Sequence, residues 1–202
     1  MACDLTLGRK EPCKKVVGGI KEVYFVSFGN LTNVGYDSVD TDVINTISES
    51  ALAYRYEVRG SSSFTQNIQT SRQNSSTSFE QVLELSLKKL SKEDNREIKK
   101  MSSGRFHVFV IDYNNNIFVA GLDNGLQVTD GNIFTGSALT EFSGYKITLR
   151  GEERTPANFL GNSIDSLGFI VNLSEDGVQF MERVQLDNGE IVSISCVNKI
   201  NN

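Results

Sequence analysis

The sequence predicts a mainly β protein with one helix, in the α+β class. Residues 79–88 alternate between apolar and polar side chains, which is the period of a half-buried strand. Residues 91–104 carry the start and stop signals of a short helix. The chain also holds 17 glycines and 12 phenylalanines but only 2 prolines, a composition typical of an ordered, turn-rich β protein.

The composition limits the size, the partners and the compartment. The 202 residues suffice for one domain with a sizeable core and a modest extension. The net charge of -5 argues against a general nucleic-acid-binding surface and against attraction to an anionic membrane. No apolar run approaches the roughly 20 residues that span a bilayer, and residues 1–5 lack signal-peptide features, so we expect a soluble chain made in the cytoplasm. The odd set Cys3, Cys13 and Cys196 predicts reduced thiols.

The first third of the chain contains two predicted strands. Residues 1–22 are mildly basic, and we interpret them as an ordered arm or loop. Residues 23–28 are β-branched or aromatic almost throughout and predict a strand. Residues 33–50 set four acids among small apolar residues and predict a surface loop, whereas the alternation in 52–58 predicts an amphipathic strand.

Residues 61–76 allow two interpretations. Apart from Phe64, Ile68 and Arg72 they are all Ser, Thr, Asn or Gln, which also suits a flexible linker. We favour a strand, because strand signals flank the segment and Phe and Ile are unusual in linkers. Its faces would carry Phe64, Gln66, Ile68 and Thr70 on one side and Thr65, Asn67, Gln69 and Ser71 on the other. A long polar hairpin follows, roughly 58–71 paired with 76–88.

The predicted helix lies near residues 91–103. Ser91 offers an N-cap oxygen, and Ile98 and Met101 share one apolar face. Acids at the start and lysines at the end complement the helix dipole. Gly104 is expected to end the helix in the left-handed conformation.

A buried hairpin follows the predicted helix. Residues 106–111 are apolar at both parities, which predicts a strand covered on both faces, for example by the helix and by a second sheet. Asn114, Asn115 and Asn116 suit a tight turn, and residues 117–120 would return antiparallel.

The last part of the chain adds further strands. Residues 144–151 alternate between two glycines and predict a strand. Strand candidates at 168–173, 177–186 and 190–197 predict a C-terminal β meander, the last two being joined by a hairpin turn at Asp187, Asn188 and Gly189. No internal repeat is evident.

No residue pattern predicts catalysis, a cofactor or a metal. His107 is the only histidine, and within a buried strand it is expected to be a core residue. With the three cysteines it lacks the short ligand spacing of zinc sites. Asp123, Glu152 and Glu153 are expected to be solvated turn acids, and the glycine pairs lack the sequence context of a phosphate loop. We therefore expect no enzyme activity.

Several segments, in order and spacing, together resemble the tail tube or tail structural proteins of bacteriophages, in particular those of gut phages including crAss-like phages. They are Cys13 with residues 17–25, residues 63–66, residues 95–99, residues 121–126 and residues 144–153. The resemblance spans residues 3 to about 160. It implies a β-sandwich or partial barrel over residues 1–160, flanked by the helix. Residues 161–202 depart from a minimal tube subunit, and we expect them to form a C-terminal β extension.

The resemblance also implies a role. Such proteins assemble into stacked rings around a channel, with long strands from each subunit joined into an inner barrel. The expectation is a virion structural protein that assembles in the host cytoplasm into a homo-oligomeric tail, neck or hub-proximal ring, a hexamer or a multiple. Its partners would be its own copies, other tail or neck proteins and DNA in transit, with no membrane. The alternative is a β-sandwich that binds carbohydrate or protein.

The polar hairpin supplies the predicted site residues. A DNA conduit should avoid a cationic wall, because released counterions would make passing DNA adhere. Thr65, Asn67, Gln69, Ser71, Glu80 and Glu84 are therefore predicted to face the channel lumen. Phe64 and Ile68 are predicted on the strand that contacts the neighbouring subunit.

Overall fold

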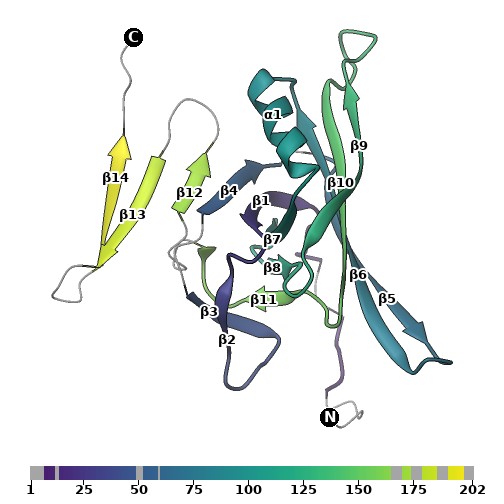
Figure 1. Cartoon of the computed structure of the whole chain (residues 1–202). Helices are drawn as coiled ribbons and strands as arrows, with labels where there is room; N and C mark the ends of the chain where they lie inside the picture. The colour runs from purple at the N-terminus through teal and green to yellow at the C-terminus, as the bar shows by residue number, and fades with distance from the viewer. Residues whose placement is uncertain are drawn as a thin grey trace.

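The computed structural model describes residues 7–11, 14–48, 52–58, 60–164, 170–173, 179–185 and 191–197. These residues form an open, mixed and mainly β arrangement with one helix, as the sequence predicts (Figure 1). The strands of the main sheet are β1 Ile20–Ser27, β2 Thr32–Tyr36, β3 Val43–Ser48, β4 Leu52–Glu57, β5 Ser63–Ser71, β6 Ser76–Lys88, β7 Arg105–Asp112, β8 Ile117–Ala120, β9 Leu126–Phe134, β10 Gly144–Glu153, β11 Asn158–Leu160 and β12 Ile170–Leu173. The helix α1 spans Lys92–Met101.

The main sheet is continuous but branched. Its order is β2-β3-β11-β8-β7-β9-β10-β6-β5, and β1 joins both β7 and β4. Most of the pairs are antiparallel, whereas β11 runs parallel to β3 and β12 runs parallel to β4. The strands β13 Gln179–Gln185 and β14 Ile191–Val197 form a separate antiparallel pair.

Strand β7 lies at the centre of the core. Val108 and Val110 belong to one buried cluster, together with the inner face of β6 and β10. Phe109 and Ile111 belong to a second cluster on the opposite face, together with Ile44 of β3. The prediction that this strand is covered on both faces is confirmed. Each such side chain contributes about 1.5–3 kcal/mol by leaving water.

Helix α1 begins as predicted but ends differently. The Ser91 Oγ accepts a hydrogen bond from the Asp94 N–H at 2.9 Å, and Met101 is buried in the β6–β10 cluster. The predicted left-handed cap at Gly104 is wrong. The C-cap residue is Ser102, whose backbone is in the right-handed helical conformation, and Gly104 does not have a positive φ. The glycine instead leaves room for Phe106, whose nearest ring atom would lie 2.5 Å from an added Cβ.

The predicted surface loop at residues 33–50 is also wrong, because β2 and β3 form a hairpin there. Its acids gather in the turn, where the Asp37 carboxylate accepts the N–H groups of Val39 and Asp40. Ile44 and Ile47 point into the core. These two residues are three positions apart, and the register of the hairpin shifts between them, so the segment lacks the regular alternation that predicts a strand.

The polar segment at residues 61–76 is a strand and not a linker. Strand β5 pairs antiparallel with β6 from Ser63 opposite Glu84 to Ser71 opposite Ser76. The hairpin is therefore shorter than the predicted pairing of 58–71 with 76–88. The strand β9 was not predicted, because its middle is polar and contains Gly131.

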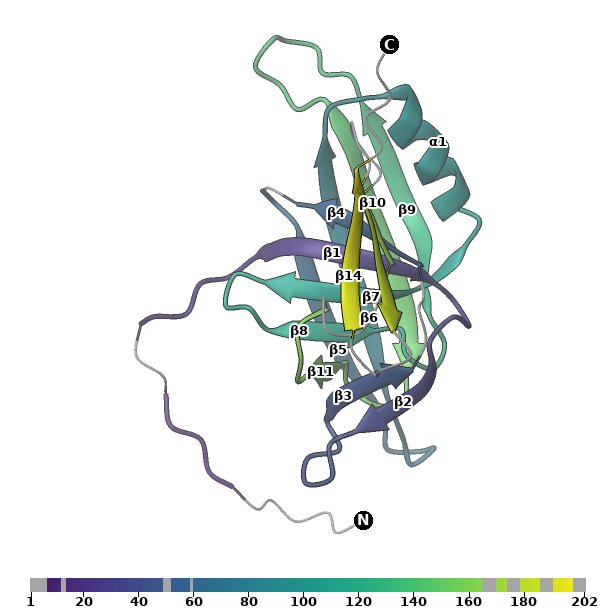
Figure 2. The same cartoon turned by 90° about the vertical axis from the view of Figure 1, so that its left-hand side faces the viewer.

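Of the described residues, those before β1 lie outside the sheets, and those after residue 169 form the last three strands. Residues 7–11 and 14–19 form an extended arm that runs away from the sheet (Figure 2). Near its root, the backbone of Val17 exchanges two hydrogen bonds with the Asn114 amide. The three predicted C-terminal strands are present, but β12 joins the main sheet beside β4, and the turn at Asp187–Gly189 lies outside the described residues. In the described part of the chain, the helix is too short and too polar to cross a bilayer.

Candidate functional site

Four long antiparallel strands, in the order β9-β10-β6-β5, form a layer along one side of the molecule (Figure 1). Cross-strand partners point to the same face of a sheet. We call one side of this layer the polar face. It comprises Ser63, Thr65, Asn67, Gln69 and Ser71 of β5, Ser76, Ser78, Glu80, Val82, Glu84, Ser86 and Lys88 of β6, Lys146, Thr148, Arg150 and Glu152 of β10, and Gln127, Asp130, Asn132 and Phe134 of β9.

The opposite side of the layer fixes the orientation of the polar face. Leu83 and Leu85 of β6 and Ile147 and Leu149 of β10 are buried against β7 and α1. Because alternate residues of a strand point to opposite sides, their neighbours must face outward. The alternation in residues 79–88 therefore specifies which side chains lie on the polar face, where Val82 is nevertheless buried.

All six predicted lumen residues lie on the polar face. The Asn67 amide donates to the Glu80 carboxylate at 3.2 Å, and the Gln69 amide donates to the same oxygen at 3.4 Å. Ser63 donates to Glu84 at 3.2 Å. The structure thus brings the six residues onto one surface, where hydrogen bonds join Asn67 and Gln69 to Glu80. The lining of a channel stays a prediction.

The sequence prediction missed the contribution of β10 and β9. Arg150 forms an ion pair with Glu80 at 2.8 Å. The pKa of Glu80 lies below its usual value, mainly because its carboxylate accepts a hydrogen bond from Asn67 and secondly because it accepts one from Arg150. The polar face carries four acids, Glu80, Glu84, Asp130 and Glu152, against three bases, Lys88, Lys146 and Arg150. The alternation in residues 144–151 could have revealed the β10 members.

The end of the layer near the β9–β10 loop is aromatic. The Lys146 ammonium lies 5.5 Å from the ring centroids of both Phe134 and Phe142. These rings meet edge to face at 5.8 Å. The cation–π contacts hold one of the three bases at the rim of the polar face.

Both outer strands of the layer present free edges in the described structure. Strand β5 pairs only with β6. Strand β9 pairs with β7 only at Leu126 and Gln127, so its edge from Val128 to Phe134 is open. Beside these edges, Ile68 is 69% exposed and Ile133 is 59% exposed. Unpaired strand edges are sites for joining another chain.

A groove of about 410 Å³ opens beside β5, on the side opposite the polar face. It lies between the root of the N-terminal arm and β5, and Phe64, Gln66 and Phe118 contribute to its wall. The rings of Phe64 and Phe118 lie 6.0 Å apart, so Phe64 is partly covered within its own subunit. Of the two predicted inter-subunit residues, Ile68 is the exposed one.

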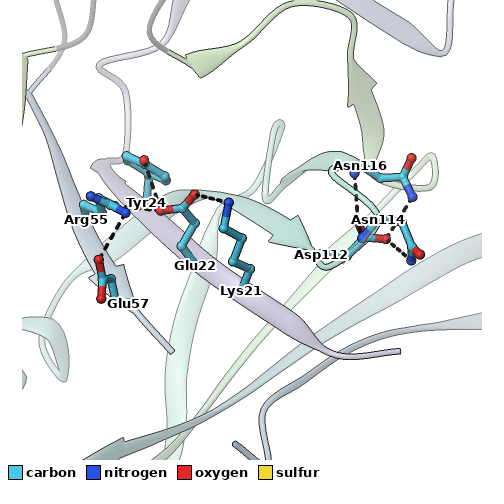
Figure 3. Close-up of polar contacts among 8 residues, drawn as sticks. All are labelled: Lys21, Glu22, Tyr24, Arg55, Glu57, Asp112, Asn114 and Asn116. Atoms are coloured by element: carbon cyan, nitrogen blue, oxygen red, sulfur yellow. Dashed lines mark hydrogen bonds and ion pairs between the residues drawn. The ribbon is translucent and has the colours of Figure 1, made fainter. Parts of the chain in front are cut away.

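Two other polar clusters have structural roles (Figure 3). The buried Glu22 carboxylate accepts from Arg55 at 2.6 Å, which ties β1 to β4. The Asp112 carboxylate accepts from the backbone and side chains of Asn114 and Asn116 and so closes the β7–β8 turn. Asn115 in this turn has φ 63°, as the sequence pattern predicts.

His107 is a buried core residue. Its Nδ1 lies 2.7 Å from the Gly121 carbonyl, and its Nε2 accepts the Gly29 N–H at 3.1 Å. This places the proton on Nδ1 of a neutral ring, and burial lowers the pKa of His107. Phe28 stacks on the ring at 4.8 Å. In the described part of the chain no cluster of three or more histidines, cysteines and acids could hold a metal.

Glu153 is not the solvated turn acid that the sequence predicted. Its carboxylate is buried and accepts the N–H groups of Asp123 and Asn124 at 3.2 and 2.9 Å. It thereby fixes the turn between β8 and β9, which needs positive φ at Gly121 and Gly125.

Comparison with known proteins assigns no family. No protein-family model matches the chain, and neither the curated proteins nor the solved structures contain a match.

Proposed function

We propose that this protein is a structural subunit of a phage virion that forms oligomeric rings of the tail, with the polar face lining a channel that conducts DNA. One observation carries the proposal: a four-stranded antiparallel layer has one polar face and a free edge on each side. Within this proposal the layer is one segment of a barrel of the tail-tube type. The sequence resemblance to tail structural proteins supports the same assignment.

The number of strands in the layer suits cyclic assembly. Because the four strands alternate in direction, β9 and β5 run in opposite directions. The β5 edge of one subunit can therefore join the β9 edge of the next as another antiparallel pair. A ring of six subunits would hold about 24 strands, more than the roughly 16–18 that already enclose an aqueous channel in porins.

The charge of the polar face suits a conduit. Duplex DNA carries about one negative charge per 1.7 Å, and a strongly basic wall would retain it through counterion release. The four acids slightly outnumber the three bases here, and Arg150 is paired with Glu80. The wall would let DNA pass without reading its sequence, since base edges are read by contacts within the grooves.

The alternative of a carbohydrate-binding module has less support. Such sites use exposed aromatic side chains gathered on one surface. The most exposed aromatic residues, Tyr36, Tyr113 and Phe159, lie on β2, in the β7–β8 turn and on β11, whereas Phe28 and Phe134 are only 37% and 38% exposed. Other tail or neck proteins, as stacking partners of the ring, belong to the proposal.

The proposal can be tested on the purified protein by light scattering after size exclusion, which should give the mass of a large assembly. Negative-stain imaging should show rings or stacked tubes. Ile68→Pro should leave soluble monomers, because it removes a backbone donor on the free β5 edge. Ile68→Thr keeps that donor and the strand propensity, and should still assemble. A monomeric wild-type protein, or normal rings from Ile68→Pro, would contradict the proposal.

A further inference from the structure

The register of the four-stranded layer shows how its two free edges are offset. Asp130 lies opposite Thr148, Thr148 opposite Glu84, and Glu84 opposite Ser63. Asp130 on β9 and Ser63 on β5 therefore lie at the same level across the layer. From that level β9 continues to Phe134 in one direction, whereas β5 continues to Ser71 in the other. Two copies can pair along these edges only if one slides along the strand direction.

The size of that slide sets the tilt of a closed barrel. Six residues along a strand are about 20 Å, and four strands are about 19 Å wide, which corresponds to a tilt of about 45°. A slide of four residues corresponds to about 35°, and a slide of eight to about 55°. Barrels have strand tilts of about 35–45°, which leaves four or six residues. Odd values are excluded because they would turn polar side chains to the core side.

The apolar residues beside the edges select six. This slide places Ile68 opposite the neighbour's Gly131 and Gln66 opposite the neighbour's Ile133. Ile68 and Ile133, the large exposed apolar residues beside the two edges, then become diagonal neighbours. The neighbour's Ile133 comes beside Phe64 and Gln66, at the wall of the 410 Å³ groove. Gly131 has no side chain, so Ile68 can lie over it.

The direction of the slide also agrees with a polar lumen. The Ser86 N–H donates to Ser62 Oγ, so the polar-face residues of β6 direct their backbone groups toward β5. For L-residues this puts β5 on the right of an upward-running β6 when the polar face is viewed. The neighbouring subunit that joins on the right is then displaced downward along the strands. When equivalent atoms of all subunits are brought to one height around the ring, the strands lean to the upper left as viewed from inside the channel. From outside this is the right-handed tilt that twisted strands adopt, whereas a polar face turned outward would give the opposite hand.

We propose that adjacent subunits join through an antiparallel β5–β9 pair with a six-residue stagger, in which Gln69 faces the neighbour's Asp130 and the neighbour's Ile133 packs beside Phe64. This inference rests on the proposed ring and specifies its interface. In the single subunit, Asp130 Oδ1 accepts the Gly131 N–H at 2.8 Å, so the side chain occupies an edge donor that pairing would use. The interface is heterologous, because each subunit contributes two different edges.

Cysteine cross-linking tests the stagger directly. Residues of the polar face form non-hydrogen-bonded pairs across this joint, with Cα atoms about 4.5 Å apart, which a disulfide can bridge. In a background with Cys3, Cys13 and Cys196 changed to Ser, Asn67→Cys is combined with Asp130→Cys, Asn132→Cys or Phe134→Cys. These pairs report slides of four, six and eight residues. Mild oxidation should link the Asn132→Cys combination at least tenfold more than the other two.

The pattern of products separates the two proposals. The favoured double variant should give a covalent ladder up to the full ring, whereas mixing the two single variants should stop at dimers. Rings that cross-link best at Asp130→Cys or Phe134→Cys, or at none of the three, overturn the stagger alone. A cysteine-free protein that forms no rings, when the wild type also forms none, overturns the proposed function as well.

A second variant tests the apolar contact. Ile133→Asp should keep the fold, because this side chain is already 59% exposed, but should reduce the ring fraction at least tenfold. Leu139→Asp is the matched control, since Leu139 is fully exposed on the β9–β10 loop and lies outside the joint. Equal assembly of both variants would overturn the role of Ile133.

Discussion

Replacing Thr65, Asn67 and Gln69 together by lysine should turn the polar face from a passive wall into one that retains DNA. The face now carries four acids and three bases, and the change raises its formal charge per subunit from about -1 to about +2. If about six phosphates are neutralised in the channel, retention falls roughly 10³-fold between 50 and 200 mM salt. The side chains are exposed, so the fold and the rings should persist.

The assay is genome ejection from particles that carry the variant rings, measured across this salt range. Ejection should be slow or blocked in low salt and should recover as salt rises. The neutral control is Thr65→Gln, Asn67→Gln and Gln69→Asn, which changes the same positions without adding charge and should eject normally. Unimpaired ejection in low salt by verified lysine-bearing rings would refute the argument, as would a ring structure with these side chains outside the channel.

Two further predictions concern the fold. Met101→Ala should lower the free energy of unfolding by about 2–5 kcal/mol and the Tm by several degrees, because Met101 is buried in the β6–β10 cluster. The control Met101→Leu should lower the free energy of unfolding by less than about 1.5 kcal/mol. An unchanged Tm for the alanine variant would contradict the prediction. Burial lowers the folded-state pKa of His107, so its stabilising contribution is complete above about pH 6.5 and declines as the pH falls below that value. The difference in unfolding free energy between the wild type and His107→Gln should therefore shrink as the pH falls from 7.5 to 5. This difference isolates the effect of the histidine, because Glu153, whose pKa is raised by burial, is present in both proteins. A difference that does not change with pH would refute the prediction.

The sequence alone determined the helix and strands whose capping residues and apolar spacing lie within the element itself. The Ser91 cap and the Ile98 and Met101 spacing specify α1 without reference to the rest of the chain. The alternation in residues 79–88 and 61–71 specifies both the strands and the residues on their outer faces. Six side chains of the candidate site could be named for that reason.

Only the tertiary structure decided the features that depend on partners distant in sequence. The polar strand β9 forms because β10 supplies its hydrogen bonds, and Glu153 is buried because a turn 29 residues earlier in the chain supplies donors. The pairing of β6 with β10 brought Arg150 to Glu80 across 70 residues and so set the charge balance of the polar face. The offset between the β5 and β9 edges depends on the registers of three successive pairs. A local sequence pattern does not contain these registers, because each one is fixed by core packing across the whole layer.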